Sequence, residues 1–439
     1  MTQAHLNLLA GALEVNGALV RLSTLQVYCT LPRGLSMLAR VLAGGTAPLL
    51  QDLYFDASGS NKTDMTSIAD MIEARARIPG CKRIGNIDGK DCHWFEAVPR
   101  PTQIRMLRGL LPSAKVLPAF TWRRAFQACF RERQAPYLTA LSVYLGDDVS
   151  GFSWNVFEAA PALVKITIKG LEQTALGVAV LRSVSAALRN GALQHLDQLY
   201  LQKCTLGDRD IKGFADALEE SGCAMRLASL TFASCGVDVE GVRLLTDLFC
   251  RGLFPAMECL DLGGNPNISD LGIMALAEAL SKSSPACLGS LVLDNVGMGD
   301  EGIAALASLV GQGRMEQLRE FNIYENAALT QQGICALARA VDARGLPFLE
   351  TFLINRSTEK AARGIGVIAF AVFKGCPQLK YFILKGLGPD NDILSEVMDG
   401  MLEAAGRAGE VWVVYEPNDY DDFEFEEDED EDEDEEEEE

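Results

Sequence analysis

The 439-residue sequence is poor in the residues and motifs that most enzymes and metal sites use. It has only three histidines, His5, His93 and His195, and none lies in a recognisable catalytic motif. No Cys-x-x-Cys pair occurs, which disfavours a zinc site. The Gly-rich phosphate-binding loop and the Gly-x-Ser-x-Gly nucleophile motif are both missing. We therefore expect no cofactor, no metal and no ordinary catalytic site.

Long apolar runs are missing as well. No run reaches the ~18 residues of a membrane-spanning helix, and Glu14 interrupts the apolar text near the start, so we expect neither a spanning helix nor a signal peptide. Among the twelve cysteines, Cys204 and Cys235 occupy equivalent places in a repeat. Small buried thiols explain such places without oxidation. These features favour a reducing compartment, which would be the cytoplasm, the nucleus or both of them.

What the sequence does have is a short repeated text. Residues 298–310 read MGDEGIAALASLV, and related text begins at Leu206, Ile268 and Leu329. A second pattern, apolar-x-x-apolar-x-apolar, recurs with successive starts 30 or 31 residues apart, at Leu196, Leu227, Met257, Leu288, Leu318, Leu349 and Leu379. Such a constant period predicts stacked copies of one structural unit.

Each unit combines two periodicities. Leu291 and Leu293 alternate as in a strand, whereas Leu306, Leu309 and Val310 lie three and four residues apart as on one helix face. Asp300 and Ser269 stand where a helix begins and are expected to accept bonds from its free amides. Gly272 and Gly302 would let the first helical turns approach a neighbour closely. One strand and one helix cannot bury their own apolar faces, so stacking into a solenoid is expected.

These units resemble the leucine-rich repeat family, and the period near 30 with the helical text LAEAL (276–280) resembles its ribonuclease-inhibitor subtype. The resemblance implies an α/β horseshoe with a parallel sheet on the concave face and helices on the convex face. Asparagines are expected at the turn after each strand; five successive units have Cys204, Cys235, Asn265, Val296 and Asn326 there.

Three regions follow from the rhythm of the repeat. Residues 163–415 form regular units, whereas residues 1–162 form degenerate ones with an irregular stretch at 80–137. We expect one continuous solenoid across both. Residues 416–439 contain nineteen acids and no Lys or Arg. Because the whole chain has a net charge of −22, residues 1–415 carry only −3. Such an acidic tail is expected to be disordered, either as a solubilising segment or as a contact for basic proteins.

Basic residues gather elsewhere, with thirteen Lys and Arg against five acids in segment 71–135. Solvated helix faces explain them, and the alternative is a basic surface for phosphate or for the chain's own tail. Direct nucleic-acid binding is disfavoured because the acidic tail would repel a polyanion.

Strand alternation also predicts a partner surface. Side chains two and four residues after each strand start face the hollow, and the next residues form its rim. The resulting candidate site, flanked by Lys165 and Lys169 before it and Tyr381 and Lys385 after it, comprises Tyr200, Lys203, Asp261, Asp294, Glu320, Asn322, Tyr324 and Glu325. Acids with two exposed tyrosines suit a protein partner that has a basic surface.

We therefore predict an intracellular protein-interaction scaffold that binds a protein partner on its concave face. The alternative is a GTPase activator, because a horseshoe with an acidic tail resembles the Ran GTPase-activating proteins. Their catalytic arginine and asparagine motifs are missing here, so we assign no catalytic residue. Stimulated hydrolysis by a Ran-like GTPase would distinguish the two hypotheses.

Overall fold

The computed structural model describes most of the chain between residues 22 and 416. The described ranges are 22–27, 34–55, 62–79, 81–84, 86–89, 100–117, 120–122, 129–130, 132, 134–145, 155–174, 177–283, 287–355, 359–385 and 392–416. The acidic tail beyond Glu416 and the apolar text before residue 22 lie outside them.

Strands and helices alternate along these residues. The N-terminal elements are β1 (Thr24–Val27), α2 (Gly34–Ala43), β2 (Asp52–Phe55), α3 (Lys62–Arg75), β3 (Asn86–Gly89), α4 (Arg100–Leu110), β4 (Phe120–Trp122), β5 (Ala140–Leu145), α6 (Asn155–Ala159), β6 (Lys165–Thr174), α7 (Gly177–Arg189) and β7 (Gln198–Cys204).

The same alternation continues to the last described residue. The following elements are α8 (Asp208–Ser221), η2 (Cys223–Met225), β8 (Ser229–Ala233), α9 (Val239–Cys250), β9 (Cys259–Asp261), η3 (Pro266–Ile268), α10 (Ser269–Lys282), β10 (Ser290–Val292), α11 (Asp300–Gly311), β11 (Glu320–Asn322), α12 (Gln331–Arg344), β12 (Thr351–Asn355), α13 (Glu359–Gly375), β13 (Tyr381–Lys385), α14 (Asp392–Ala404) and β14 (Trp412–Glu416).

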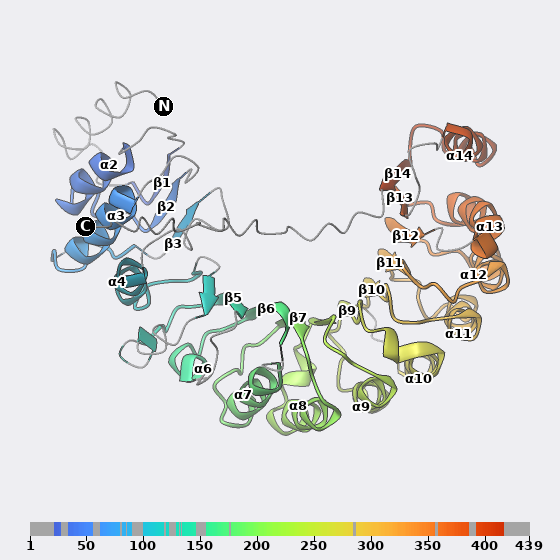
Figure 1. Cartoon of the computed structure of the whole chain (residues 1–439), viewed down its shortest axis with the longest axis horizontal. Coiled ribbons are helices and arrows are strands. Elements are labelled where there is room, and N and C mark those ends of the chain that lie inside the picture. The colour runs from blue at the N-terminus through green and yellow to red at the C-terminus, as the bar shows by residue number, and fades with distance from the viewer. Residues whose placement is uncertain are drawn as a thin grey trace, which may run out of the picture.

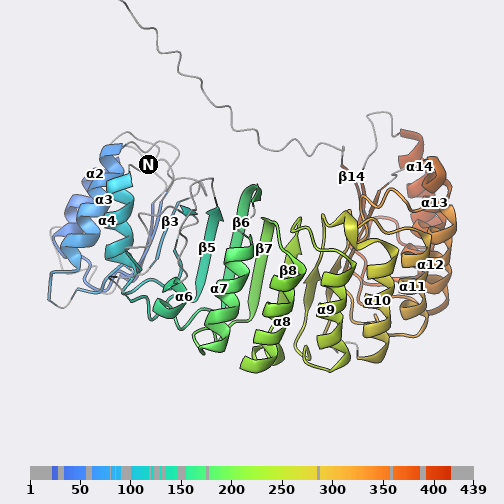
Figure 2. The same cartoon turned by 60° about the horizontal axis from the view of Figure 1, so that its bottom comes forward.

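The strands lie in order and pair in parallel, which confirms the predicted leucine-rich repeat solenoid. An 11-stranded sheet runs from β4 to β14, with each strand next to its sequence neighbour. The chain curves into an arc with strands along the inner side and helices along the outer side (Figures 1 and 2). In-register pairing places equivalent residues side by side, for example Ser290 next to Cys259 on one side and Glu320 on the other.

The predicted strand register is confirmed by burial. Leu291 and Leu293 are buried, whereas Val292 between them is partly exposed. Leu306, Leu309 and Val310 of α11 are also buried, so strand and helix bury their apolar sides in one core. That core continues through the units as a single cluster of buried side chains.

Buried asparagines close the turn that follows a strand. The Asn326 side-chain carbonyl accepts from Val296 N at 3.1 Å and Met298 N at 3.0 Å, both in the preceding unit. Its amide donates to Leu293 O at 2.8 Å and Ile323 O at 3.0 Å. Asn265, two units earlier in the chain, makes the same set of bonds. One side chain therefore satisfies buried backbone groups of two units, which are costly to leave unpaired.

Cysteine replaces asparagine in two earlier turns. The Cys235 thiol is 3.4 Å from Leu201 O and 3.3 Å from Ala233 O, and Cys204 is 3.2 Å from Gln202 O. Burial raises the pKa of Cys204 to about 11 and raises that of Cys235 further, so both stay protonated donors. A thiol is both a weaker donor and a weaker acceptor than the asparagine amide, so it fulfils this role only in part.

Helix caps connect successive units in a way that was not predicted. We expected Asp300 to cap its own helix, α11, but its Oδ1 accepts from Thr330 N at 2.9 Å and Gly333 N at 3.1 Å, at the start of α12. Asp270 likewise accepts from Gly299 N and Gly302 N, each at 2.7 Å. Ser269 provides no such bond, because α10 has no side-chain cap. A carboxylate fits these positive helix ends in either unit.

Glycine permits this close contact between helix starts, as the sequence indicated. A Cβ on Gly302 would lie 2.6 Å from Asp270 Oδ1 of the preceding unit, whereas the nearest atom to one on Gly272 would be Ile268 Cγ2 of its own unit, also at 2.6 Å. Only a residue without a side chain fits at these positions.

The N-terminal third is less regular than the rest of the chain. Within the described residues, β1, β2 and β3 form a separate three-stranded sheet. Segment 80–137, expected to be irregular, contains β3, α4 and β4. Its irregularity appears in register, because the pairs Val116–Ala140 and Phe120–Val143 differ by one residue. Pro118 lies between them in the sequence and has no amide hydrogen for a ladder bond.

Two smaller features concern the ends of the regions. Glu416, expected to begin the acidic tail, is the last residue of β14. Its backbone lies opposite Lys385 of β13 in the parallel ladder. No helix within the described residues has the length and apolar character needed to cross a membrane.

The register is tested by truncating two adjacent strand residues. Leu291→Ala removes a fully buried side chain and should lower the free energy of unfolding by ~2–5 kcal/mol. Val292→Ala, which removes a partly exposed side chain, should cost well under that. Urea denaturation of both variants measures the difference, and equal shifts in midpoint would contradict the assigned register.

The turn bonds are tested at Asn326. Asn326→Ala leaves two amides of the preceding unit and two carbonyls without their partner and should cost about 2–4 kcal/mol in free energy of unfolding. Asn267→Ala, at an exposed position in η3, is the matched control and should change stability by under ~0.5 kcal/mol. Comparable losses in the two variants would show that the bonds do not stabilise the turn.

Candidate functional site

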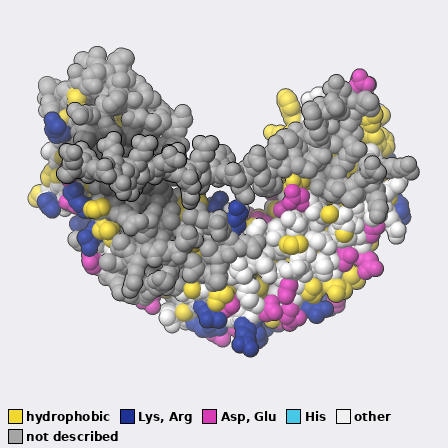
Figure 3. Space-filling view, viewed as in Figure 1, with side chains coloured by type: hydrophobic (Ala, Val, Ile, Leu, Met, Phe, Trp, Pro, Cys, Tyr) yellow, Lys and Arg dark blue, Asp and Glu magenta, His cyan; other side chains and the backbone are white. Residues whose placement is uncertain are grey.

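The predicted site residues occupy the inner face of the sheet and the turn that borders it. Tyr200 and Lys203 belong to β7, Asp261 ends β9, Asp294 follows β10, and Glu320 and Asn322 belong to β11. Tyr324 and Glu325 lie in the turn after β11. Acidic and basic side chains meet at the inner margin of the arc in Figure 3.

Three carboxylates, the acid cluster of Asp261, Asp294 and Glu320, come from neighbouring units. Asp294 Oδ1 accepts from Asn322 Nδ2 at 3.1 Å, and Glu320 Oε2 accepts from Ser290 Oγ at 2.8 Å. Asp261 Oδ1 accepts from Gly263 N at 2.9 Å. Gly263 also leaves room for the cluster, because a Cβ there would lie 2.4 Å from Asp294 Oδ1.

Crowding makes Asp261 harder to ionise. Burial raises its pKa to about 6, and the negative charges of Asp294 and Glu320 add to the increase, whereas the bond from Gly263 N opposes it. Asp261 therefore changes its charge near neutral pH, unlike an ordinary exposed aspartate. A cation placed beside the cluster would favour its ionised form.

Tyr200 lies at the boundary between acidic and basic parts of the inner face. Burial raises its pKa to about 12, with further contributions from Asp261, Cys235 and Asp294. Its hydroxyl lies 3.4 Å from Gln202 Oε1. Lys169 of β6 approaches the Tyr200 ring, with Nζ 5.7 Å from the ring centroid, a cation–π contact. Lys203 is partly exposed in the left-handed conformation at the end of β7.

Tyr324 does not fit the predicted surface. We expected an exposed tyrosine, but only 2% of Tyr324 is exposed, and its hydroxyl donates to Glu325 Oε1 at 2.7 Å. The alternation of the strand stops at Asn322, and the chain turns at Glu325, whose φ is +55°. Asn295 N donates to Tyr324 O at 2.8 Å, so the turn packs against the preceding unit. The expectation that the residues after the strand form an exposed rim is therefore wrong for Tyr324.

Exposed aromatic side chains lie at the C-terminal end of the sheet, where only Tyr381 was predicted to lie on the inner face. Trp412 is 71% exposed and pairs in register with Tyr381, which is 45% exposed. Trp412 lies 31 residues after Tyr381, so one more step of the repeat would have identified it. We call these two residues, together with the partly exposed Leu353, Ile383 and Val414, the aromatic end.

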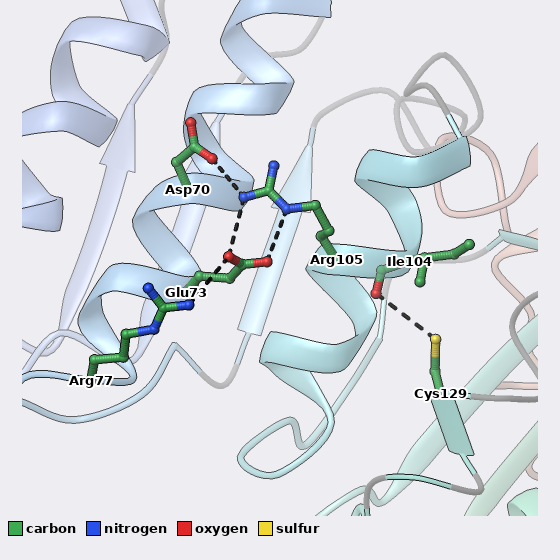
Figure 4. A network of polar contacts seen from close by, with 6 residues as sticks. All are labelled: Asp70, Glu73, Arg77, Ile104, Arg105 and Cys129. Atoms are coloured by element: carbon green, nitrogen blue, oxygen red, sulfur yellow. Dashed lines mark hydrogen bonds and ion pairs between the residues drawn. The ribbon is translucent and has the colours of Figure 1, made fainter.

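The basic segment 71–135 is partly neutralised on the helical side. In Figure 4, Arg105 of α4 reaches Asp70 and Glu73 of α3, with Arg105 Nη2 2.7 Å from Asp70 Oδ1 and Nε 2.9 Å from Glu73 Oε1. These bonds raise the pKa of Arg105 further. Arg108 pairs with Glu132 at 3.0 Å. Ion pairing between helices therefore accounts for two of the basic residues of this segment.

The described part of the chain was searched for side chains that could bind a metal ion together. No group of three or more His, Cys, Asp or Glu residues there could hold a metal ion.

Comparison with known proteins supports the same fold. A family model described as Leucine Rich repeat matches residues 256–277, which span β9 and the start of α10. No curated protein matches the chain. The match supports the leucine-rich repeat family, whose repeats generally mediate protein–protein interaction.

The raised pKa of Asp261 predicts a pH-dependent effect on stability. Because the folded pKa of about 6 exceeds the ordinary 3.8, ionisation of Asp261 opposes folding above pH 6. Asp261→Asn should therefore raise the free energy of unfolding by roughly 1 kcal/mol at pH 7.5. This advantage should shrink as pH falls from 6 to 4. Thermal melts across this range measure it, and an advantage that is constant with pH would contradict the crowded-carboxylate account.

Proposed function

We propose that the protein is an interaction scaffold that binds a basic protein surface on its concave face. The acid cluster carries the proposal, because the carboxylates of Asp261, Asp294 and Glu320, all partly exposed, gather on the inner face of one sheet. Within the described residues, Asp261 and Glu320 form no ion pair with Lys or Arg; they bond to Gly263 N and Ser290 Oγ instead. The charges of Asp261 and Glu320 would therefore act on a partner that approaches this face.

The arrangement of charge supports orientation as well as attraction. Lys169 and Lys203 flank the cluster on the β6–β7 side, while the acids occupy β9 to β11. A partner with basic residues would therefore approach the middle of the sheet and avoid its basic side. Complementary charges of this kind act mainly on the association rate and on the choice of partner.

The acidic tail would supply a second contact of low specificity. Its nineteen acids would attract basic proteins over about a Debye length, ~8 Å at physiological salt. We further propose that the protein acts in the cytoplasm, the nucleus or both, and that its units are of the ribonuclease-inhibitor subtype. The repeat period near 30 supports the subtype. The free cysteines of the turns support a reducing compartment.

The alternative function, activation of a Ran-like GTPase, has its own assay. Purified full-length protein is added to a GTP-loaded Ran-like GTPase, and phosphate release is followed over time. The scaffold proposal predicts the intrinsic rate of hydrolysis. Stimulation by orders of magnitude would replace it with the GTPase-activator function.

Charge reversal tests the concave site directly. Partners are first captured from a lysate with the full-length protein, and their binding kinetics are then measured for a variant with Asp294→Lys and Glu320→Lys. We expect an association rate reduced about tenfold or more at low salt, with a smaller effect at high salt. The melting temperature should change little, because Glu320 is partly exposed at the surface.

A matched variant separates position from net charge. Glu396→Lys with Glu403→Lys makes the same charge change at exposed sites on α14. This control should bind the captured partner at nearly the normal rate. If the two double variants behave alike, the acid cluster is only solvated surface.

A further inference from the structure

The aromatic end presents apolar surface that the fold itself does not use. Tyr381 and Trp412 occupy equivalent positions on the last two strands, and each exposes much of its side chain. Hydrophobic side chains project at the inner side of the arm where Figure 1 labels β13 and β14 (Figure 3). Large aromatic residues are the commonest anchors of protein interfaces when a partner covers them.

An apolar floor adjoins these aromatics along the next row of the sheet. Leu353, Ile383 and Val414 pair in register on β12, β13 and β14 and are partly exposed. In the middle of the sheet, the equivalent positions of the same row hold Asp261 on β9, Val292 on β10 and Asn322 on β11. Across the two rows, the last acid is Glu320 on β11, and both rows are apolar on β13 and β14.

Strand spacing sets the distance between the two regions. Glu320 is two strands from Tyr381, and Asp261 is four strands from Ile383. At ~4.8 Å per strand the separations are about 10 and 19 Å. An extended peptide covers ~3.3 Å per residue, so three to six residues span them.

We propose that the aromatic end and the acid cluster together bind one extended segment of a partner protein. The segment carries a large apolar residue that packs on Tyr381 and Trp412. It also carries a Lys or Arg, three to six residues away, that pairs with the acid cluster. The inference rests on the proposed concave-face function and specifies the chemistry of the partner.

Charge favours this occupant over the alternatives. The chain's own tail has the aromatics Tyr420, Phe423 and Phe425, but its nineteen acids would face the acid cluster. A second copy docked through the same sheet would likewise oppose acid to acid. A purely apolar peptide would leave the carboxylates desolvated without a counterion, which is unfavourable. A basic and apolar segment satisfies both regions.

Selection of peptides tests this inference. Random displayed peptides of roughly 16 residues, long enough to cover the ~19 Å span, are selected on immobilised full-length protein and sequenced. Fluorescently labelled versions of the enriched peptides are then titrated against variants. The peptides should share a Lys or Arg and a large apolar residue three to six positions apart.

Variants then assign each anchor. Trp412→Ala should weaken the enriched peptides about tenfold or more, and the double reversal of Asp294 and Glu320 to Lys should do the same. Tyr137→Ala, which truncates a 61%-exposed aromatic outside the sheet, is the control and should leave affinity unchanged. Tyr381→Ala reports on the same contact independently if Trp412→Ala lowers the melting temperature.

The possible outcomes distinguish failure of the two-anchor segment from failure of the concave-face function. Peptides that depend on the acids but not on Trp412 or Tyr381 would overturn the two-anchor segment and leave the concave-face function standing. Peptides insensitive to both sets of variants would overturn both. Enrichment of apolar peptides without a basic residue, of acidic peptides that resemble the tail, or of none at all would overturn the two-anchor inference.

Discussion

Each turn that follows a strand in the central units depends on hydrogen bonds between neighbouring units. Asn265 and Asn326 each satisfy amides of the preceding unit and carbonyls of two units. Asp270 and Asp300 bind the first amides of the next helix. Because these buried groups have no solvent to replace a lost partner, adjacent units must keep one relative position. That position sets the strand spacing on which the inner face is built.

The strand residues that point into the hollow of the arc, away from the core, can vary to suit a partner. Core residues such as Leu291 and Phe321 hold the strands, while the residues between them contribute little to the core. These intervening positions carry hydroxyls on β8, carboxylates on β9 and β11 and aromatics on β13 and β14. Charge and apolar character therefore vary along the arc without disturbing its stacking, which is the property that a binding scaffold needs.

The strand register and the period were predictable because burial follows simple alternation, as Leu291, Val292 and Leu293 show. The fate of Tyr324 was not, because alternation ends where β11 ends and only the turn geometry buries that ring. The caps at Asp270 and Asp300 had the expected chemistry but unexpected partners, since a sequence pattern does not show which unit lies against a carboxylate. Trp412 was missed although the period points to it, because the text around it lacks the leucines of the earlier units. The break between β3 and β4 had no sequence signal beyond a poor fit to the repeat.

Oxidative footprinting of a captured complex tests whether the partner occupies the concave face. Hydroxyl radicals modify exposed aromatic and sulfur-containing side chains, and mass spectrometry compares the free protein with the complex. We expect Tyr381 and Trp412 on the inner face to lose reactivity on binding. Met274 of α10 and Phe348, which are exposed outside the sheet, should keep theirs. Protection of Met274 and Phe348 with unchanged Tyr381 and Trp412 would place the partner outside the concave face and contradict the account.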